Sequence, residues 1–222
     1  MKKVVIFGVG NFAKLVHSYL KNSPHKVVGF TVNSSMLKES IFLDLPVISF
    51  ENIVKIFPPK DFCLFIAMGH TNMNKNRAKI FNESKKLGYE LLSYVHPTST
   101  IGEDVKMGEN CLILENNVIQ PFVTIGDDVI IWSNNVISHD VVIKDHCFII
   151  HQVVISGYVT IEPYCIIAAN STINNRVIIA KECIIGMGTL IMKNTIEKGV
   201  YAIDSSQRLP IITSDGLKDI TS

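Results

Sequence analysis

An aliphatic residue returns at every sixth position through the C-terminal half of the chain. The run extends without a gap from Ile101 to Ile191 and covers sixteen hexads, of which only the second departs from isoleucine, at Met107. Four residues further on, each hexad carries a small or medium-sized side chain, from Val105 to Thr195. A strand alternates with period two and a helix recurs near 3.6, so neither explains a strict period of six. A solenoid does, when each hexad is one short strand with a corner and three hexads close a triangular coil.

The cysteines fit this coil length. Cys147, Cys165 and Cys183 are eighteen residues apart, and Cys111 lies thirty-six residues before Cys147. Three hexads per coil would stack these residues in one column, with coils separated by roughly the strand spacing of 4.8 Å. A column of thiols can indicate a metal site or disulfides, but no closed set of ligands accompanies it. We therefore expect cysteine as a small core filler, and no metal.

Composition and charge exclude several classes of function. Apolar residues make up 47 % of the 222 residues, enough for a sizeable core in one large or two small domains. Lys and Arg number 21 against 20 Asp and Glu, so no basic excess predicts binding to nucleic acid or to an anionic membrane. The apolar runs are too short for a membrane span or a signal peptide. Five cysteines without a secretion signal predict reduced thiols in a cytoplasmic protein.

The N-terminal part is typical of a small βαβ unit. Strands are predicted over residues 3–7 and 27–32, with a helix over 14–22 between them. The connecting sequence GVGNFA, at residues 8–13, has the G-x-G-x-x-A spacing of a Rossmann-like phosphate-binding turn. An NAD site favours an acidic residue after the second strand, where this chain has Asn33. The turn therefore indicates phosphate binding more than redox chemistry.

Two more strands are predicted before the hexads begin. They cover residues 62–68 and 91–95, and a polar helix that carries Asn76 and Arg77 lies between them. A His-Pro pair then leads into the first hexad. The predicted organisation is a small Rossmann-like domain at 1–97, a β-helix domain at 98–202 and a C-terminal tail at 203–222.

Uninterrupted hexads of the form Ile-Gly-x-x-(Val, Cys or Asn)-x resemble those of the left-handed parallel β-helix acyltransferases. The resemblance implies an α/β N-terminal Rossmann-like domain followed by an all-β left-handed parallel β-helix. It also implies a homotrimer with CoA in a cleft between neighbouring helices. The small α/β half, the Asn/Arg helix and the His-Pro junction are similar to one subfamily, which acetylates sialic acid on oxygen or nucleotide-linked 4-amino sugars on nitrogen.

In that subfamily the small domain holds the sugar nucleotide and not a redox cofactor. The positions that match its motifs are Gly8, Gly10, Ala13, Gly69, Asn72 and Arg77. The substrate-binding set implied by the resemblance consists of Gly8, Gly10, Asn11, Phe12, Asn33, Gly69, Asn72 and Arg77. Many members carry acidic residues after the second strand, and this chain departs from them with Val32 and Asn33.

His139 is the candidate general base. It is third in its hexad, at a corner that points outward, and the resemblance places the catalytic histidine at this point of the coil series. Asp140 follows it and can raise the basicity of the ring and fix its tautomer, or can be an ordinary turn residue. His151 is third in a hexad on a different corner, where it lines the same cleft or only the surface. His146, fourth in its hexad, is expected at the surface.

Acetyl-CoA is the expected co-substrate, and it should run along a corner of the later coils. The predicted contacts are Gly157, Ala168, Ala169, Met187 and Gly188. Small residues at a corner let the pantetheine arm approach the backbone, although glycine and alanine also suit tight corners by themselves. Arg208, beyond the last hexad, is a further candidate for the CoA phosphates.

The leading hypothesis is an acetyl-CoA-dependent acetyltransferase that acts on the amino group of a nucleotide-linked 4-amino sugar for bacterial surface glycans. An alternative is O-acetylation of sialic acid or a related sugar, because an amine and a hydroxyl need the same base and the same thioester. Two other classes are a Rossmann oxidoreductase fused to a structural solenoid and a non-catalytic scaffold. The missing acidic residue disfavours the first, and the pair of His139 and Asp140 disfavours the second.

Overall fold

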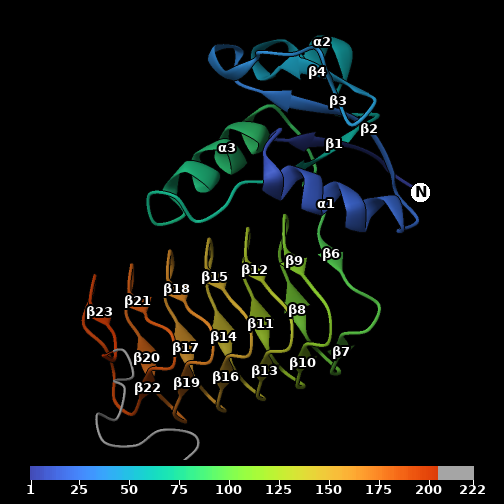
Figure 1. Ribbon diagram of the computed structural model, residues 1–222. Helices are drawn as coiled ribbons and strands as arrows, with labels where there is room; N and C mark the ends of the chain where they lie inside the picture. The colour runs from blue at the N-terminus through green and yellow to red at the C-terminus, as the bar shows by residue number, and fades with distance from the viewer. Residues whose placement is uncertain (205–222) are drawn as a thin grey trace, which may run out of the picture.

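The computed structural model describes residues 1–204, and the predicted C-terminal tail with Arg208 lies outside the described residues from position 205 onward. An α/β domain sits on a three-sided β-helix (Figure 1). The sheet of the α/β domain has the order β3-β4-β2-β1-β5. Its strands are β1 (Lys3–Phe7), β2 (Lys26–Val32), β3 (Ile41–Phe42), β4 (Leu45–Ser49) and β5 (Cys63–Ile66). The helices are α1 (Asn11–Lys21), α2 (Ile53–Ile56) and α3 (Lys75–Lys86).

The βαβ unit that the sequence predicts is present. β1 pairs in parallel with both β2 and β5, so it lies inside the sheet, and its residues from Val4 to Phe7 are buried. A continuous apolar strand is expected for a parallel sheet that is covered on both faces. α1 begins at Asn11, three residues before the predicted start, because Gly10 already has the extended backbone of an N-cap. β3, β4 and α2 were not predicted.

The β-helix consists of two-residue strands in three parallel sheets, which form three faces. The first, here called the covered face, comprises β6 (Tyr94–Val95), β9 (Leu112–Ile113), β12 (Ile130–Ile131), β15 (Phe148–Ile149), β18 (Ile166–Ile167), β21 (Ile184–Ile185) and β23 (Val200–Tyr201). The second face comprises β7 (Thr100–Ile101), β10 (Val118–Ile119), β13 (Val136–Ile137), β16 (Val154–Ile155), β19 (Thr172–Ile173) and β22 (Leu190–Ile191). The third face comprises β8 (Lys106–Met107), β11 (Thr124–Ile125), β14 (Val142–Ile143), β17 (Thr160–Ile161) and β20 (Ile178–Ile179).

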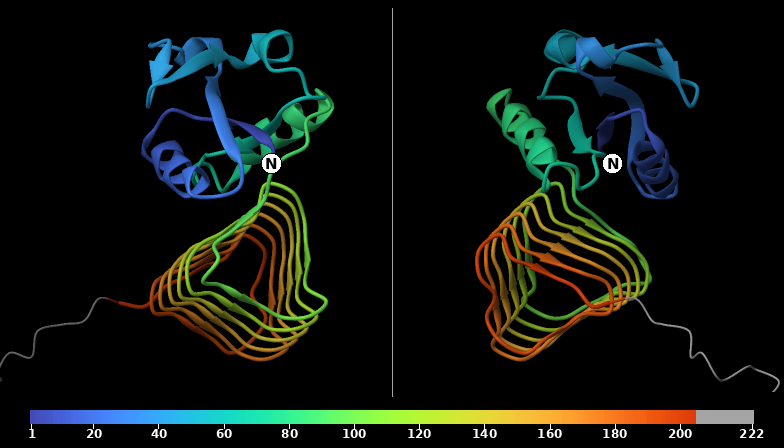
Figure 2. Two further views of the ribbon diagram at one scale, coloured as in Figure 1. Left: turned by 90° about the vertical axis from the view of Figure 1, so that its right-hand side faces the viewer. Right: turned by 60° about the vertical axis from the view of Figure 1, so that its left-hand side comes forward.

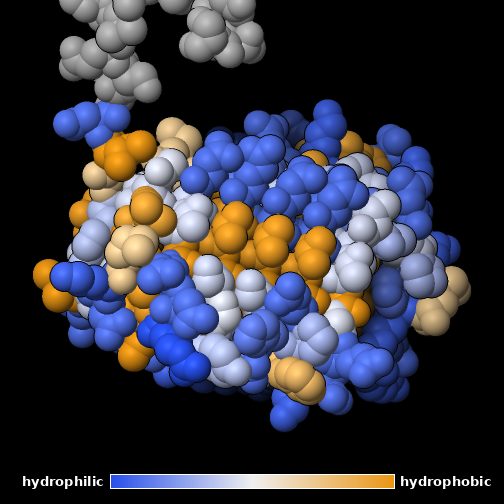
Figure 3. All heavy atoms as spheres, turned by 90° about the horizontal axis from the view of Figure 1, so that it is seen from below, coloured by the Kyte–Doolittle hydropathy of each residue, from blue (hydrophilic) through white to orange (hydrophobic). Residues whose placement is uncertain are grey.

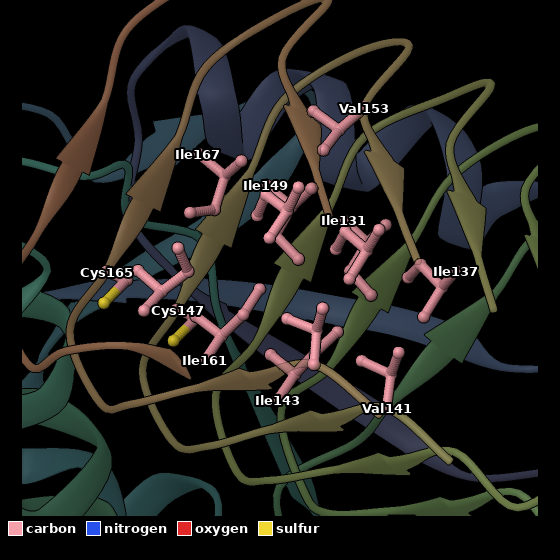
Figure 4. Close-up of a cluster of buried hydrophobic side chains, with 14 of the residues drawn as sticks. Ile131, Ile137, Val141, Ile143, Cys147, Ile149, Val153, Ile161, Cys165 and Ile167 are labelled. Carbon is pink, nitrogen blue, oxygen red and sulfur yellow. The ribbon is translucent and has the colours of Figure 1, made fainter. Parts of the chain in front are cut away.

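From β6 to β22, paired strands are eighteen residues apart, as Ile119 and Ile137 are, so three hexads make one coil. Figure 2 shows the triangular outline of these coils. The hexad isoleucines point inward, and Figure 4 shows Ile131 and Ile149 stacked above one another in the interior. Both are fully buried. The predicted β-helix of three hexads per coil is confirmed by these three parallel sheets.

The cysteines act as core fillers. All five are free and buried, and Figure 4 shows Cys147 next to Cys165 in the column predicted from the eighteen-residue spacing. The thiol of Cys165 donates to the carbonyl oxygen of Ala180 (3.1 Å), and that of Cys111 to the carbonyl oxygen of Gly126 (3.1 Å). Burial raises the pKa of Cys111 to about 12, so this thiol stays protonated.

The corners explain a second pattern in the hexads. The fourth residue of each hexad from Ile101 to Ile185 has a left-handed backbone, with φ near 57° at Asp140 and 60° at His146. Asp and Asn tolerate this conformation better than most residues, and they occupy it at several corners, including Asp104, Asn116 and Asn134. The presence of aspartate at position 140 therefore has a backbone reason that is independent of any chemistry.

The three faces differ in what covers their outward side chains. On the covered face, Leu112, Ile130 and Phe148 are buried in one cluster with β1 and α1 residues of the α/β domain. On the second face, Val136 and Val154 are each 39 % exposed. Figure 3 shows an apolar stripe on the lower side of the molecule, where the second face lies in Figure 1.

One boundary differs from the prediction. Residues 91–95 were expected as the last strand of the α/β domain, but only Leu91 bridges to that sheet, at Leu64. β6 pairs with β9, through Tyr94 with Leu112, and is therefore the first strand of the covered face. Val95 lies six residues before Ile101 and continues the aliphatic series by one hexad, but the prediction began the series at Ile101 and so missed this strand.

Candidate active site

A pocket of about 800 Å³ opens at the carboxyl ends of β1, β2 and β5. This edge of a parallel sheet is where open α/β folds bind their ligands. Of the predicted substrate residues, Gly8, Gly10 and Asn33 line it. Apolar contacts come from Val32 and Phe42.

The two glycines of the turn serve different purposes. Gly8 has φ +123°, and a Cβ on it would lie 2.9 Å from the carbonyl oxygen of Ala67, so no other residue fits without a shift of the backbone. Gly10 has an ordinary φ of −92°, and a Cβ on it would meet nothing within 4 Å. Gly8 therefore keeps β1 and β5 close together, whereas Gly10 keeps the mouth of the pocket open.

Arg77 is not a pocket residue, which corrects its assignment to the substrate set. Its side chain is fully buried between α3 and the β-helix. Nε donates to the Asp128 carboxylate (2.9 Å), and Nη1 donates to the carbonyl oxygen of Gly69 (3.2 Å). The sequence motif identified Arg77 as important but gave no means of telling a ligand contact from an interdomain contact.

Three other predicted residues lie beside the pocket without lining it. Asn11 begins α1, and the ring of Phe12 packs 6.0 Å from that of Trp132 on the β-helix. Asn72 donates from its amide to the side-chain oxygen of Asn76 (3.2 Å). Asn11 and Phe12 thus belong to the first turn of α1, whereas Asn72 and Gly69 lie in the segment between β5 and α3.

Sequence reasoning missed a large part of the pocket. Asn76, Lys79 and Ile80 reach it from one face of α3, and residues 36–39 reach it from the segment after β2. The α3 residues could have been found, because 76, 79 and 80 share a helical face while Arg77 lies on another. Residues 36–39 follow a 3-10 turn and have no periodic signal.

His139 and Asp140 form the pair that the sequence predicts. Nδ1 of His139 lies 2.9 Å from Oδ2 of Asp140, and the His139 backbone N–H donates to Oε1 of Gln120 (2.9 Å). A carboxylate beside Nδ1 selects the tautomer with the proton on Nδ1, which leaves a lone pair on Nε2. The His139 side chain is 47 % exposed, so Nε2 is accessible to a reactant.

Two neighbours hold the ring in place. Tyr158 meets it edge-on at 5.1 Å between centroids, and Arg176 stacks on Tyr158 at 4.4 Å. Gly157, one coil further along the same corner, leaves space for the ring: a Cβ there would lie 3.0 Å from Cε1 and 3.1 Å from Nε2 of His139. Gly157 therefore leaves room for the His139 ring, in addition to suiting the tight corner.

Replacing Gly157 by alanine should displace the imidazole by a few tenths of an ångström, because the added methyl group meets Cε1 and Nε2. We expect kcat to fall roughly tenfold, since misplacement of a reacting group by about 1 Å can cost about a hundredfold. The melting temperature should change little. Steady-state kinetics with a thermal melt checks both values, and an unchanged kcat would show that the ring does not act from this position.

The other β-helix histidines have different surroundings. His151 lies at the corner between the covered and second faces, with Nδ1 3.1 Å from the hydroxyl of Ser133 and its ring 5.0 Å from that of Trp132. His146 was expected at the surface, but it is only 8 % exposed, and Nδ1 lies 2.8 Å from Oδ2 of Asp128. The α/β domain lies over this corner and buries His146. No local sequence pattern predicts this burial.

The predicted CoA contacts divide between two corners. Gly157 lies at the corner between the second and third faces, below His139, whereas Ala168, Ala169, Met187 and Gly188 lie at the corner of His151. We call these the His139 corner and the His151 corner. The side chain of Met187 is exposed. One ligand on a single chain cannot follow both corners, because the second face separates them.

The pocket and His139 lie on opposite sides of the β-helix. The α/β domain packs on the covered face, and the His139 corner joins the other two faces. The view along the coils in Figure 2 shows this separation of the α/β domain from the far corner. Among residues 1–204, no helix is long and apolar enough to cross a membrane, and no group of His, Cys, Asp or Glu could hold a metal ion.

Comparisons with known proteins agree with this architecture. Residues 3–84 match the family described as the PglD N-terminal domain, and residues 104–139 and 140–175 match bacterial transferase hexapeptide repeats. No curated protein matches the sequence.

Several solved structures share the fold over nearly the whole chain. One is a perosamine N-acetyltransferase from Caulobacter crescentus, a histidine-to-asparagine mutant in complex with CoA and GDP-perosamine. The match has a TM-score of 0.81 at 21 % identity, and it covers 90 % of this chain and 93 % of the Caulobacter chain. The acetyltransferase domain of PglB from Neisseria gonorrhoeae, in complex with acetyl coenzyme A, has a TM-score of 0.79 at 18 % identity, with coverages of 90 % and 95 %. The resemblance inferred from the hexads is confirmed, and the chain combines a PglD N-terminal domain with bacterial transferase hexapeptide repeats.

Proposed function

We propose that the protein transfers an acetyl group from acetyl-CoA to the amino group of a nucleotide-linked amino sugar. The observation that carries the proposal is the His139–Asp140 pair, with Nδ1 bound to the carboxylate and Nε2 free at an exposed corner. The fold is shared with acetyltransferases whose structures contain CoA and GDP-perosamine, or acetyl-CoA. Nothing but a positioned base, a nucleophile and a thioester is needed for this chemistry.

The proposed step transfers the acetyl group from the CoA thioester to the amine. The neutral amine of the sugar attacks the thioester carbonyl, and Nε2 of His139 accepts a proton from the amine nitrogen as the C–N bond forms. The C–S bond then breaks, the proton passes to the CoA sulfur, and the products are the amide and CoA. Asp140 supports the imidazolium that forms in between, because its carboxylate accepts the hydrogen bond from Nδ1.

The pocket at the edge of the α/β sheet is the proposed site of the sugar nucleotide. The turn at Gly8 and Gly10 presents backbone at the start of α1, where the helix dipole favours a phosphate group. Lys79 and Lys38 line the same pocket and can pair with a diphosphate. Asn33 stands where a dinucleotide-binding fold would present a carboxylate to the ribose, so NAD is not the proposed ligand.

A homotrimer is proposed because the parts of the site lie apart in one chain. A three-fold assembly makes heterologous contacts, in which one surface of a chain meets a different surface of the next. The His139 corner of one copy can then face the His151 corner of its neighbour. Gly157 of one copy and Ala169 and Met187 of the other would together line one CoA cleft. The exposed valines of the second face, Val136 and Val154, lie between these corners and suit such an interface.

The experiment that tests the function measures release of free CoA from acetyl-CoA. The acceptors are a panel of UDP-, GDP- and dTDP-linked 4-amino sugars, the corresponding hydroxy sugars, and sialic acid. We expect turnover with at least one amino sugar nucleotide. Turnover with a hydroxyl acceptor alone would establish O-acetylation, and no turnover with any acceptor would contradict the proposal. The five free thiols suit a reducing compartment, and the cytoplasm is the proposed location.

A further inference from the structure

A buried polar cluster joins the α/β domain to the β-helix. Arg77 on α3 and Asp128 on the β-helix are fully buried and form an ion pair, Nε to Oδ1, at 2.9 Å. The second carboxylate oxygen of Asp128 lies 2.8 Å from Nδ1 of His146. Asn110 donates from Nδ2 to Oδ1 of Asp128 (2.7 Å). We call Arg77, Asp128, His146 and Asn110 the interface cluster.

The guanidinium of Arg77 makes more contacts than an ion pair requires. Nη2 donates to the carbonyl oxygen of Asp128 (2.9 Å), and Nη1 donates to the carbonyl oxygen of Gly69 and to the side-chain oxygen of Asn74, both at 3.2 Å. A buried ion pair is a weak source of stability, because desolvation offsets most of the attraction. The fixed fork of a guanidinium instead imposes geometry on every group that it contacts.

The groups that it fixes form the turn between β5 and α3. Asn72, Met73 and Asn74 all have left-handed backbones, with φ of 52°, 50° and 62°. A left-handed residue other than glycine is strained and persists only where its surroundings hold it. Arg77 holds both ends of this turn, at Gly69 and Asn74. Asn74 is itself buried, and its amide donates to the carbonyl oxygen of Cys165 on the β-helix (3.4 Å).

The same cluster holds the edge of the sheet beyond the bridge between Leu64 and Leu91. β5 is the last strand in the sheet order, and the backbone N–H of Ile66 donates to Oδ1 of Asn110 (2.8 Å). Asn110 in turn donates to Asp128. Ala67 and Met68, which follow directly, line the pocket. The β-helix therefore controls the end of β5 as well as the turn after it.

α3 carries the pocket on one face and the cluster on another. Asn76 and Lys79 line the pocket, while Arg77 and Phe81 are buried toward the β-helix. The ring of Phe81 lies 5.6 Å from that of His146, in an edge-on contact. Because α3 carries both sets of residues, a shift of the interface cluster also shifts the pocket wall.

We propose that Arg77, Asp128 and His146 are positioning residues for the nucleotide pocket. They hold the end of β5, the turn at residues 69–74 and α3 against the β-helix, so that Met68, Asn76 and Lys79 keep the shape of the pocket wall. The identity of the ligand rests on the proposed function, but the positioning itself does not. Ligand affinity in the α/β domain thus depends on residues of the β-helix that never touch the ligand.

The main test replaces Arg77 by lysine, which keeps the charge near Asp128 but cannot reach Gly69 and Asn74 together. We expect faster amide hydrogen exchange over residues 66–74 in the free protein. We also expect weaker binding of UDP, GDP or dTDP, whichever the wild type binds, by roughly 2- to 30-fold, the range of couplings through packed networks. The KM for the sugar nucleotide should rise by the same factor, with kcat and the affinity for acetyl-CoA unchanged.

Lys75→Gln is the matched control. Lys75 is the first residue of α3 and forms an exposed ion pair with Glu182 of the β-helix at 2.7 Å, so it also joins the two domains. It does not contact the turn through any side-chain hydrogen bond in residues 1–204. Its removal should leave exchange over residues 66–74 and nucleotide affinity as in the wild type.

A second pair of variants applies if Arg77→Lys does not fold. His146 has φ 60°, which both asparagine and glycine tolerate. His146→Asn keeps a donor near the place of Nδ1 and should behave as the wild type, whereas His146→Gly removes it and should loosen the turn. If the Arg77 and His146 variants lower the melting temperature but leave exchange and nucleotide affinity unchanged, the cluster is structural only and the inference fails. If the wild type binds no nucleotide, the proposed function fails instead, and exchange over residues 66–74 still decides the inference.

Discussion

Replacing His139 by alanine should lower kcat by about 10²–10⁴-fold, the usual contribution of a general base. The reason is that Nε2 is the proton acceptor placed at the exposed corner, with Nδ1 committed to Asp140. The KM for both substrates should change little, because the imidazole contributes to proton transfer more than to binding. Steady-state kinetics on the acceptor identified by CoA release gives both values.

Two matched variants make the result specific. Asp140→Asn keeps the left-handed corner and the hydrogen-bond geometry but removes the charge, so its loss in kcat should be smaller than that of His139→Ala. His151→Ala removes the histidine at the other corner. Among the described residues, the ring of His151 forms a hydrogen bond only with the hydroxyl of Ser133. This variant should retain most of kcat. Near-full activity in His139→Ala with a large loss in His151→Ala would move the base to the His151 corner.

The β-helix was predictable because its signal is local and repeated. Each hexad from Ile113 onward supplies one buried isoleucine, so sixteen copies of nearly the same short pattern leave little ambiguity. The hydrogen bond between His139 and Asp140 was predictable for a similar reason, since the two residues are adjacent at a corner whose geometry is fixed.

The interface cluster was not predictable in the same way. Arg77 and Asp128 are 51 residues apart, and nothing in either segment indicates that α3 packs on the covered face. His146 is fourth in its hexad, a position that is exposed at Phe122 and Tyr158 on another corner, and the α/β domain above its own corner makes it buried. Burial of this kind depends on the placement of two domains, which a period of six does not encode.

The pocket was predictable in part. The spacing of Gly8 and Gly10 located it, because the tight turn at the end of β1 needs glycine at position 8 and Gly10 follows at the mouth of the pocket. Residues 36–39 were missed because irregular segments have no period. The strands that follow them, β3 and β4, are short and were not predicted either. The separation of pocket from His139 was also missed, because it follows from which face the α/β domain covers.

Mixing two inactive variants should restore activity if neighbouring copies share one site. Gly10→Trp fills the pocket from a position where a Cβ meets nothing within 4 Å and the backbone is unstrained, so the chain should fold but bind no sugar nucleotide. His139→Ala keeps the pocket and lacks the base. Because the two parts lie on opposite sides of the β-helix in one chain, the pocket of one copy must serve the His139 of another.

The expected recovery follows from random assembly. When the two variants are co-expressed in equal amounts, about one site in four combines an intact pocket with an intact His139, so about a quarter of wild-type activity should return. A site within one chain predicts no recovery. As a control, the double variant mixed equally with the wild type should give about a quarter of the activity for a shared site and about half for a site within one chain. Light scattering on the same samples measures the assembly, and a monomer near 25 kDa with full wild-type activity would contradict the shared site.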